Sequence, residues 1–296
     1  MKRKDFLKAI SLLPLTASAI NLNDLKRITD TFENSPKMPA IFIGHGSPMN
    51  AIQVNAFTKK LNAVGANFVG DKKPKAILVV SAHWLTKGTF VCNAPQPKII
   101  YDFGGFPDEL FAVKYPAKGS PEFAKAVNAV NPKIQETHEW GLDHGAWTIL
   151  KHIFPKADIP VFQLSIDYYQ SMQYHFDLAK TLSSLREKGV LIIGSGNIVH
   201  NLGMSMKKFQ EDDPKAFDWA IEFDAWVKQK LVGADFKSLL EYEKQGTAAK
   251  LSVPTVDHYV PMIYTVGLAK DKEPITQLYE QVEYGGVSMR CFQVGL

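Results

Sequence analysis

Histidines are the side chains of this sequence best suited to metal chemistry. The neutral imidazole nitrogen is a ligand for zinc, iron, copper and nickel. Three such nitrogens can hold one ion and leave positions open for water and substrate. The chain has eight histidines, His45, His83, His138, His144, His152, His175, His200 and His258. They predict a site for a single divalent metal ion, provided that the fold brings at least three of them together.

Three of these histidines, His45, His83 and His200, each follow a short apolar run of the kind that forms a buried strand. Small residues flank each histidine, so that backbone and ligand can approach closely. In open α/β sheets, ligands bind at the carboxyl ends of the strands. We therefore expect these three side chains to lie just beyond three strand ends and to share the metal. The runs span residues 41–43, 77–80 and 190–193.

The other histidines have different settings. His258 is a candidate fourth ligand, and its neighbour Asp257 could orient an imidazole. His144 lies in a glycine-flanked turn before a predicted helix and suits a general acid or base, since histidine titrates near neutral pH. Three more, His138, His152 and His175, are interpreted as solvated or surface residues.

The elements that must position these side chains alternate between apolar runs and helix-length segments. Ser120 followed by Pro121 is typical of a helix start. Continuous apolar strands alternating with helices predict an α/β fold, a single domain whose central sheet is mainly parallel or mixed and is flanked by helices. The expected strands are 39–44, 76–81, 159–165, 190–194 and 288–294, and two expected amphipathic helices are 170–188, ending at Gly189, and 214–232.

The first residues resemble an export signal. A basic start containing Lys2, Arg3 and Lys4 precedes the apolar run 9–15 and a stretch of small residues. This pattern predicts a secretory signal peptide at 1–19, a linker at 20–37 and a catalytic domain at 38–296. The location would then be periplasmic or otherwise exported. The alternative is an amphipathic N-terminal helix that is never cleaved, with a cytoplasmic protein.

Composition limits the partners and the redox chemistry. The 296 residues are 46% hydrophobic, and the formal net charge is +4. No run of five like charges occurs, so neither nucleic-acid binding nor stable membrane insertion is expected. The two cysteines, Cys92 and Cys291, could form one disulfide or remain as two buried thiols. No CxxC pair is present that would indicate a thiolate zinc site.

The segments around the histidines, taken in order, resemble the 4,5-DOPA extradiol dioxygenase family of class III extradiol ring-cleavage enzymes. The resemblance runs from about Met38 to the C-terminus. It rests on Gly44-His45-Gly46-Ser47-Pro48-Met49, Ser81-Ala82-His83-Trp84, Tyr101-Asp102-Phe103-Gly104-Gly105-Phe106-Pro107, Asp143-His144-Gly145, Gly196-Asn197-Ile198-Val199-His200-Asn201 and Asp257-His258-Tyr259-Val260-Pro261.

The resemblance implies a role for each site histidine. His45, His83 and His200 match the metal-binding histidines of the family, and His258 matches a further histidine near the metal. His144 matches a histidine to which we assign proton transfer. The implied partners are a small aromatic diol such as DOPA and dioxygen, and the implied cofactor is one divalent metal, Zn²⁺ or Fe²⁺. Two alternatives stay open: a zinc-dependent hydrolase or lyase on the same scaffold, and a non-catalytic metal-binding protein.

Overall fold

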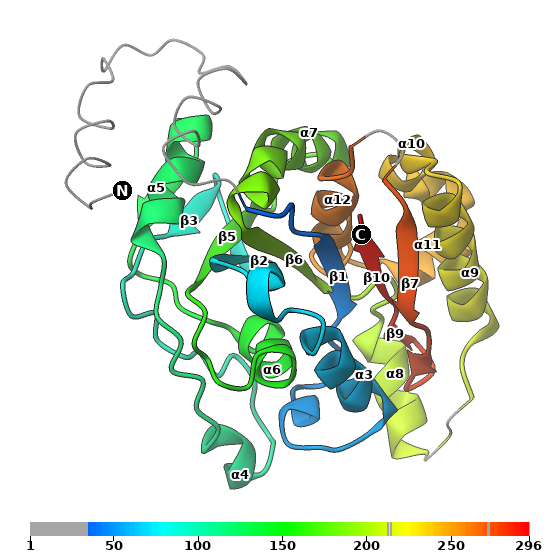
Figure 1. The fold of residues 1–296 in the computed structure, drawn as a ribbon. Helices are drawn as coiled ribbons and strands as arrows, with labels where there is room; N and C mark the ends of the chain where they lie inside the picture. The colour runs from blue at the N-terminus through cyan, green and yellow to red at the C-terminus, as the bar shows by residue number, and fades with distance from the viewer. Residues whose placement is uncertain (1–34, 212, 214, 271–272, 296) are drawn as a thin grey trace.

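The computed structural model describes residues 35–211, 213, 215–270 and 273–295. The predicted signal peptide at 1–19, and all but the last three residues of the predicted linker at 20–37, lie outside this part of the chain. Eight strands form one mixed sheet in the order β4-β3-β5-β2-β6-β1-β10-β7, and β8 pairs with β9 in a separate hairpin (Figure 1). The strands are β1 (Ala40–Gly44), β2 (Ala76–Thr86), β3 (Phe90–Cys92), β4 (Gln135–Thr137), β5 (Val161–Asp167), β6 (Val190–Gly196), β7 (Ile275–Tyr279), β8 (Val282–Glu283), β9 (Val287–Ser288) and β10 (Cys291–Val294).

Helices connect most of these strands and cover the sheet. The α-helices of the described chain are α3 (Ala56–Gly65), α4 (Asp108–Phe111), α5 (Pro121–Val130), α6 (His144–Ile153), α7 (Met172–Leu182), α8 (Leu202–Gln210), α9 (Asp218–Val232), α10 (Phe236–Leu240), α11 (Thr247–Ser252) and α12 (Val260–Gly267). Four short 3-10 helices are η1 (Pro48–Ala51), η2 (Gly70–Lys72), η3 (Ser183–Lys188) and η4 (Tyr242–Gln245). No helix in these ranges is both long and apolar enough to cross a bilayer.

The centre of the sheet is parallel. Strand β6 pairs in parallel with β1 on one side and with β2 on the other, and β2 pairs in parallel with β5. The outer pairs β1–β10, β10–β7 and β3–β5 are antiparallel. The carboxyl ends of four neighbouring strands therefore meet at one edge, where ligands bind in such sheets. The predicted α/β fold with a mixed central sheet is confirmed.

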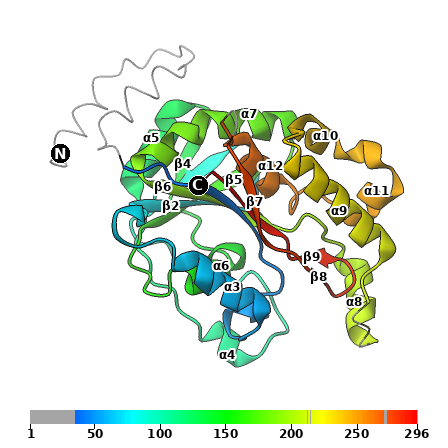
Figure 2. The ribbon, with the colours of Figure 1, turned by 45° about the vertical axis from the view of Figure 1, so that its right-hand side comes forward.

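Both faces of the sheet are buried, as the continuous apolar strands require. Along β1, Ala40 and Phe42 point into one core, and Ile41 and Ile43 point into the other. Figure 2 shows the resulting layers, with α5, α7 and α12 on one side of the sheet and α3 and α6 on the other. Two packed cores hold the central strands, and with them the strand ends, in fixed positions.

Several predicted elements differ from the observed ones. The predicted helix 170–188 is α7 followed by η3, and it ends as expected at Gly189, whose φ is 85°. The predicted strand 288–294 is divided between β9 and β10, and Arg290, in the gap between them, forms a buried ion pair with Asp224. Ser120 precedes α5, but its side chain makes no capping hydrogen bond.

Two histidines are more buried than the sequence indicated. His175 is only 1% exposed, and its Nδ1 atom lies 3.2 Å from the hydroxyl oxygen of Tyr264, so the prediction of a surface residue is wrong. The imidazole of His152 is partly buried, with Nε2 2.7 Å from the carbonyl oxygen of Asn50. His138 is exposed, as expected. A position on an amphipathic helix does not reveal which neighbouring helix will cover it.

The two cysteines are both buried and both free. Burial raises the pKa of the Cys291 thiol to about 12. Of the two alternatives left open by the sequence, the structure has the pair of buried thiols.

Candidate metal centre

Five histidines from distant parts of the sequence meet at the carboxyl edge of the parallel strands. His45 directly follows β1, and His200 lies four residues after β6. His144 is the first residue of α6, and His258 comes shortly before α12. His83 differs from its predicted position, because it lies within β2 and not beyond it. The pairing of β2 with β5 shifts register between Val80 and Leu85, and this irregularity surrounds His83.

The imidazole rings are closely packed. The Nε2 atoms of His45 and His83 are 3.1 Å apart. The ring of His258 lies 5.3 Å from that of His45 and 5.0 Å from that of His83, measured between ring centres. The ring of His200 stacks on that of His258 at 3.5 Å and 8°. All four predicted metal-binding histidines are therefore in one cluster.

His144 lies in the same cluster, with its ring centre 3.9 Å from that of His83. Ligand atoms of His45, His83 and His144 all lie within 4.8 Å of one another. Ligand atoms of His200, Asp257 and His258 form a second group with the same property. His144, the predicted proton carrier, is therefore as close to His45 and His83 as a third metal ligand would be. The roles of the five histidines stay predictions.

A hydrogen bond fixes the proton on the His45 ring. The Nδ1 atom of His45 lies 3.0 Å from the hydroxyl oxygen of Ser195, at the end of β6. The Ser195 hydroxyl donates its proton to the carbonyl oxygen of Gly145 at 2.5 Å. Ser195 must therefore accept from Nδ1–H of His45, because a hydroxyl carries one proton. The Nε2 atom of His45 is left with a free lone pair directed at the other histidines.

The carboxylate of Asp102 lies within ion-pair distance of two more imidazoles. Its Oδ2 atom lies 3.0 Å from Nδ1 of His144 and 3.3 Å from Nδ1 of His83, and its Oδ1 atom accepts from the backbone N–H of His144 at 2.9 Å. Burial by itself raises the pKa of Asp102, but the contacts with His144 and His83 outweigh it and lower the pKa below its usual value. An ionised carboxylate at Nδ1 favours the tautomer whose Nε2 is free.

The carboxylate of Asp257 plays the same part for the next residue, because it hydrogen-bonds Nδ1 of His258. The expectation that Asp257 orients an imidazole is met by this contact. Burial lowers the pKa of His83 to about 4 and the pKa of His200 to about 4, and it lowers the pKa of His45 and of His258 well below the usual value. These four imidazoles are therefore neutral at pH 7, which is the form that binds metal.

A buried polar network positions the segment that carries His144. The carboxylate of Asp143 is fully buried and accepts from the hydroxyl of Ser81 at 2.6 Å and from the amide of Gln163 at 2.8 Å. It also caps α6 by accepting from the backbone N–H of Ala146 at 3.2 Å. Because Ser81 lies on β2 two residues before His83, this network ties His144 and His83 to one framework.

An aromatic side chain borders the histidine cluster. The ring of Phe103 lies edge-on to that of His144 at 5.6 Å. Phe103 belongs to the glycine-containing segment that also carries Asp102. The rings of Trp84 and Trp140 stack on each other at 5.4 Å and 5°, in a separate apolar cluster with Cys92 and Ala94. A planar apolar ring beside the nitrogen ligands provides a surface suited to an aromatic substrate.

The sequence reasoning missed the roles of Asp102 and Ser195. Asp102 lies in the segment 101–107 that carries part of the family resemblance, and Ser195 lies between Gly194 and Gly196. A hydroxyl between two glycines near a strand end was the available signal for Ser195, and a carboxylate within an aromatic segment was the signal for Asp102. The pairing itself could not be read from the sequence, because 150 residues separate His45 from Ser195.

The chain is similar to known aromatic ring-opening dioxygenases. Residues 38–292 match the family described as the catalytic LigB subunit of aromatic ring-opening dioxygenase. The chain is 40% identical over 276 residues to the 4,5-DOPA dioxygenase extradiol of Escherichia coli (strain K12), covering 90% of this chain and 98% of that protein. It is 35% identical over 261 residues to the protein of the same name from Beta vulgaris, covering 85% and 94% of the two chains.

A solved structure has the same fold. The crystal structure of an uncharacterized protein from Escherichia coli K12 superposes with a TM-score of 0.75 at 36% sequence identity, covering 88% of this chain and all of that one. The resemblance seen in the ordered histidine segments is therefore confirmed at the level of the family and of the reaction class. The chain belongs to the family of the catalytic LigB subunit of aromatic ring-opening dioxygenases, and it is an extradiol dioxygenase.

Proposed function

We propose that this enzyme uses one divalent metal ion to open the ring of a catechol such as DOPA with dioxygen. The observation that carries the proposal is the 3.1 Å separation of the Nε2 atoms of His45 and His83. The chain matches two relatives named 4,5-DOPA dioxygenase extradiol over nearly their whole length, and this similarity supports the substrate class.

The donor set fits a metal ion. Nitrogen ligands lie about 2.0–2.1 Å from a bound zinc ion, so two of them on one ion are roughly 3 Å apart. The Nε2 atoms of His45 and His83 meet this condition. Their Nδ1 atoms lie beside Ser195 and Asp102, as outer partners of metal-binding histidines usually do.

We assign the metal to His45, His83 and His200, with His258 as the fourth ligand, and proton transfer to His144. A second arrangement, with His144 as a ligand beside His45 and His83, is supported by the mutual distances of their ligand atoms. Imidazole ligands suit either Zn²⁺ or Fe²⁺. A bound divalent ion would lower the pKa of the catechol hydroxyls, and iron(II) would add the redox chemistry that dioxygen requires.

The side chains of the protein move one proton and contact the aromatic ring. With Nδ1 beside the Asp102 carboxylate, His144 carries its free lone pair on Nε2, which accepts the proton of a catechol hydroxyl. The Asp102 carboxylate stabilises the imidazolium that results. Phe103, edge-on to His144, provides apolar surface for the ring. Both oxygen atoms of dioxygen enter the product, one in the aldehyde and one in the carboxylate, when the bond beside the diol is cleaved.

Anaerobic loading with iron(II), followed by addition of a catechol and air, tests the function. The expected result is uptake of one dioxygen per catechol and a coloured ring-opened semialdehyde. The zinc-loaded protein serves as the control and is expected to be inactive, because zinc has no accessible second oxidation state. Turnover with zinc and without oxygen would instead support a hydrolase or lyase. Tight metal binding with no turnover across a catechol panel would support a non-catalytic metal-binding protein.

Two matched variants separate the roles of the histidines. With His200 as a ligand, His200→Ala loses metal affinity by an order of magnitude or more. With His144 as the proton carrier, His144→Ala retains metal and loses about 100-fold or more in kcat. The reverse pattern in a metal titration would establish the second arrangement, in which His144 is a ligand.

We also propose export across a membrane, supported by the basic start and the apolar run 9–15. Cell fractionation and N-terminal sequencing of the mature protein test it. Cleavage after about residue 19 is expected, and a full-length cytoplasmic protein would contradict export.

A further inference from the structure

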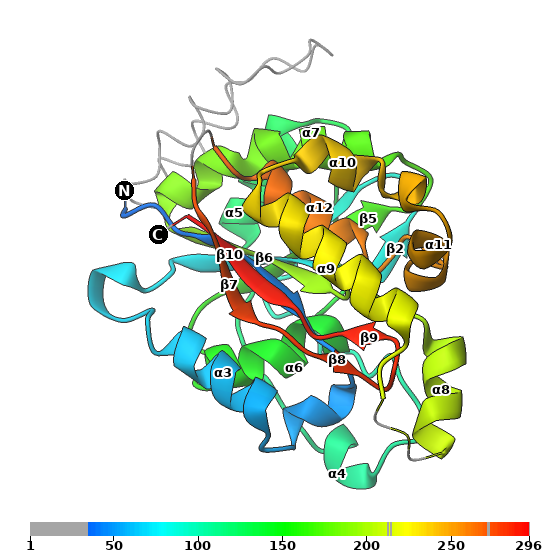
Figure 3. The ribbon, with the colours of Figure 1, turned by 90° about the vertical axis from the view of Figure 1, so that its right-hand side faces the viewer.

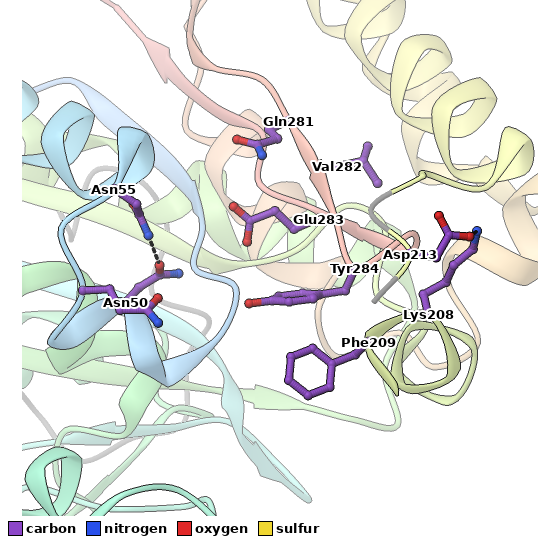
Figure 4. Close-up of a pocket in the computed structure, with 10 residues that line it drawn as sticks. Asn50, Asn55, Lys208, Phe209, Asp213, Gln281, Val282, Glu283 and Tyr284 are labelled. Atoms are coloured by element: carbon purple, nitrogen blue, oxygen red, sulfur yellow. Dashed lines mark hydrogen bonds and ion pairs between the residues drawn. The ribbon is translucent and has the colours of Figure 1, made fainter. Parts of the chain in front are cut away.

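A cavity of about 330 Å³ lies outside the histidine cluster. One wall is formed by the segment from η1 to the start of α3, and the other by the C-terminal end of α8 and the β8–β9 hairpin. Figure 3 shows this hairpin beside α8 at the edge of the molecule, and Figure 4 shows the lining side chains. The residues used below are Asn50, Gln53, Phe209, Gln281, Glu283 and Tyr284.

Both walls are connected to the metal centre. The side-chain amide of Asn50 donates to the backbone carbonyl of His45 at 3.2 Å. On the other wall, Val287 of the hairpin forms a backbone bridge with His200. A ligand in this cavity would therefore lie between segments that carry two of the predicted metal ligands.

The carboxylate of Glu283 is the charged group of the cavity that has no cationic partner among the described residues. It points into the space between the two walls (Figure 4), and among the described residues no cationic side chain forms an ion pair with it. The cavity's one lysine, Lys208, is paired with Asp213 and lies 4.9 Å from the ring centre of Phe217. Burial raises the pKa of Glu283, because a carboxylate loses water without gaining a cation.

Two aromatic rings adjoin this carboxylate. The rings of Phe209 and Tyr284 pack edge to face at 5.7 Å, and both side chains remain partly open to solvent, at 62% and 36% exposure. Tyr284 has a φ of 49°, and Gly285 follows with a φ of 73°, so a tight hairpin turn holds the tyrosine in place. The side-chain amides of Asn50, Gln53 and Gln281 line the remaining sides; the oxygens of Asn50 and Gln281 each already accept one hydrogen bond, from Asn55 and from Tyr279. A carboxylate, two ring faces and neutral acceptors together suit a cation.

We propose that this cavity binds an organic cation of the primary ammonium class, with Glu283 as the counter-ion and the rings of Phe209 and Tyr284 as cation–π partners. The carboxylate accepts hydrogen bonds from the ammonium group, and the rings cover its apolar substituent. The binding of an ammonium compound does not depend on the ring-cleavage reaction or on the metal.

Calorimetric titration of the full chain with 2-phenylethylamine tests the proposal at low ionic strength. Saturable binding is expected, and the uncharged analogue 2-phenylethanol is expected to bind at least tenfold more weakly. Glu283→Gln, which keeps the shape of the side chain, should weaken binding of the amine at least tenfold. Phe209→Leu should weaken it about two- to fivefold through loss of a cation–π partner. Equal binding of amine and alcohol, or unchanged binding by both variants, would overturn the proposal.

Glu241→Gln is the matched control, since it removes one carboxylate that is paired with Lys244 outside the cavity. It should leave amine binding unchanged. A loss equal to that of Glu283→Gln would mean that only net charge matters, and the proposed site would be rejected.

The ammonium group could belong to the substrate or to a separate amine, and kinetics distinguish these sources. This arm rests on the proposed function. If the substrate carries the group, Glu283→Gln raises KM for dopamine at least tenfold and leaves KM for 4-methylcatechol unchanged. If a separate amine binds there, both KM values stay unchanged while calorimetric binding is lost. An inactive iron-loaded enzyme that still binds the amine would count against the proposed function and leave the cation site supported.

Discussion

The Nδ1 atom of His45 lies 3.0 Å from the hydroxyl oxygen of Ser195, on the neighbouring strand. Since the Ser195 hydroxyl is already donating to Gly145, the direction of the His45 bond is determined. The free lone pair of His45 is on Nε2, 3.1 Å from Nε2 of His83. A serine that is not itself a predicted metal ligand thus decides which nitrogen of His45 is available for the metal.

Ser195→Ala should weaken metal binding about 10- to 100-fold, because the imidazole of His45 loses the acceptor that fixes its tautomer. Metal affinity is measured by competition with a chromophoric chelator. Ser184→Ala is the control, since the Ser184 hydroxyl is buried and has no hydrogen-bond partner among the described residues. Equal affinities of the two variants would contradict the role of Ser195.

Asp102→Asn should lower kcat about 100-fold and metal affinity about tenfold, because His144 and His83 both lose a negative charge beside Nδ1. Steady-state oxygen uptake and a metal titration measure the two effects. Asp108→Asn, an exposed position in the first turn of α4, is the control and should match the wild type. If Asp102→Asn behaves like this control, the carboxylate does not position the imidazoles.

Gly145→Ala should disturb the metal centre through packing. An added Cβ would come 2.6 Å from the hydroxyl oxygen of Ser81 and 2.9 Å from Cδ2 of His83, so these side chains or α6 must shift. We expect the free energy of unfolding to fall by about 1–3 kcal/mol and metal affinity to fall with it. Chemical denaturation and a metal titration provide the measurements.

Gly203→Ala on α8 is the matched control, because the nearest atom to its added Cβ is 3.7 Å away. It should leave metal binding unchanged and stability unchanged or raised by up to about 1 kcal/mol. If the Gly145→Ala protein binds metal as tightly as the Gly203→Ala control, the metal centre tolerates the added methyl group.

His175 should make stability depend on pH. Burial lowers its pKa to about 4 in the folded state, below the ordinary value of 6.5. Between these values the unfolded chain binds the proton and the folded chain does not, so stability rises with pH and is lost as the pH falls from about 6.5 towards 4. The single group contributes about 2 kcal/mol of this loss between pH 7 and pH 5.

The difference between wild type and His175→Gln isolates this effect, because the histidines of the metal centre titrate in both proteins. Urea unfolding at pH 7 and pH 5 should show the smaller pH dependence in the variant. The exposed His138→Gln should behave like the wild type. If His175→Gln and the wild type lose equal stability, His175 does not titrate as a buried neutral group.

The sequence by itself determined the central strands and the histidines at or near their carboxyl ends. A short apolar run bounded by turn residues is consistent with a buried strand, and the observed β1, β5 and β6 agree with this prediction. The ordered histidine segments were sufficient to identify the family. A strand and a histidine segment are each defined by residues that are neighbours in the sequence, so both can be predicted from the sequence.

Only the tertiary structure decided which groups surround each imidazole. Ser195 reaches His45 because β6 lies beside β1, and Asp102 reaches both His83 and His144 because its loop folds over the end of the sheet. His175 is buried because α12 packs against α7. Such contacts depend on the order of strands and the packing of helices. A hydrogen bond across a sheet joins residues that can be far apart in the sequence, and their distance along the chain does not indicate that they will meet in the fold.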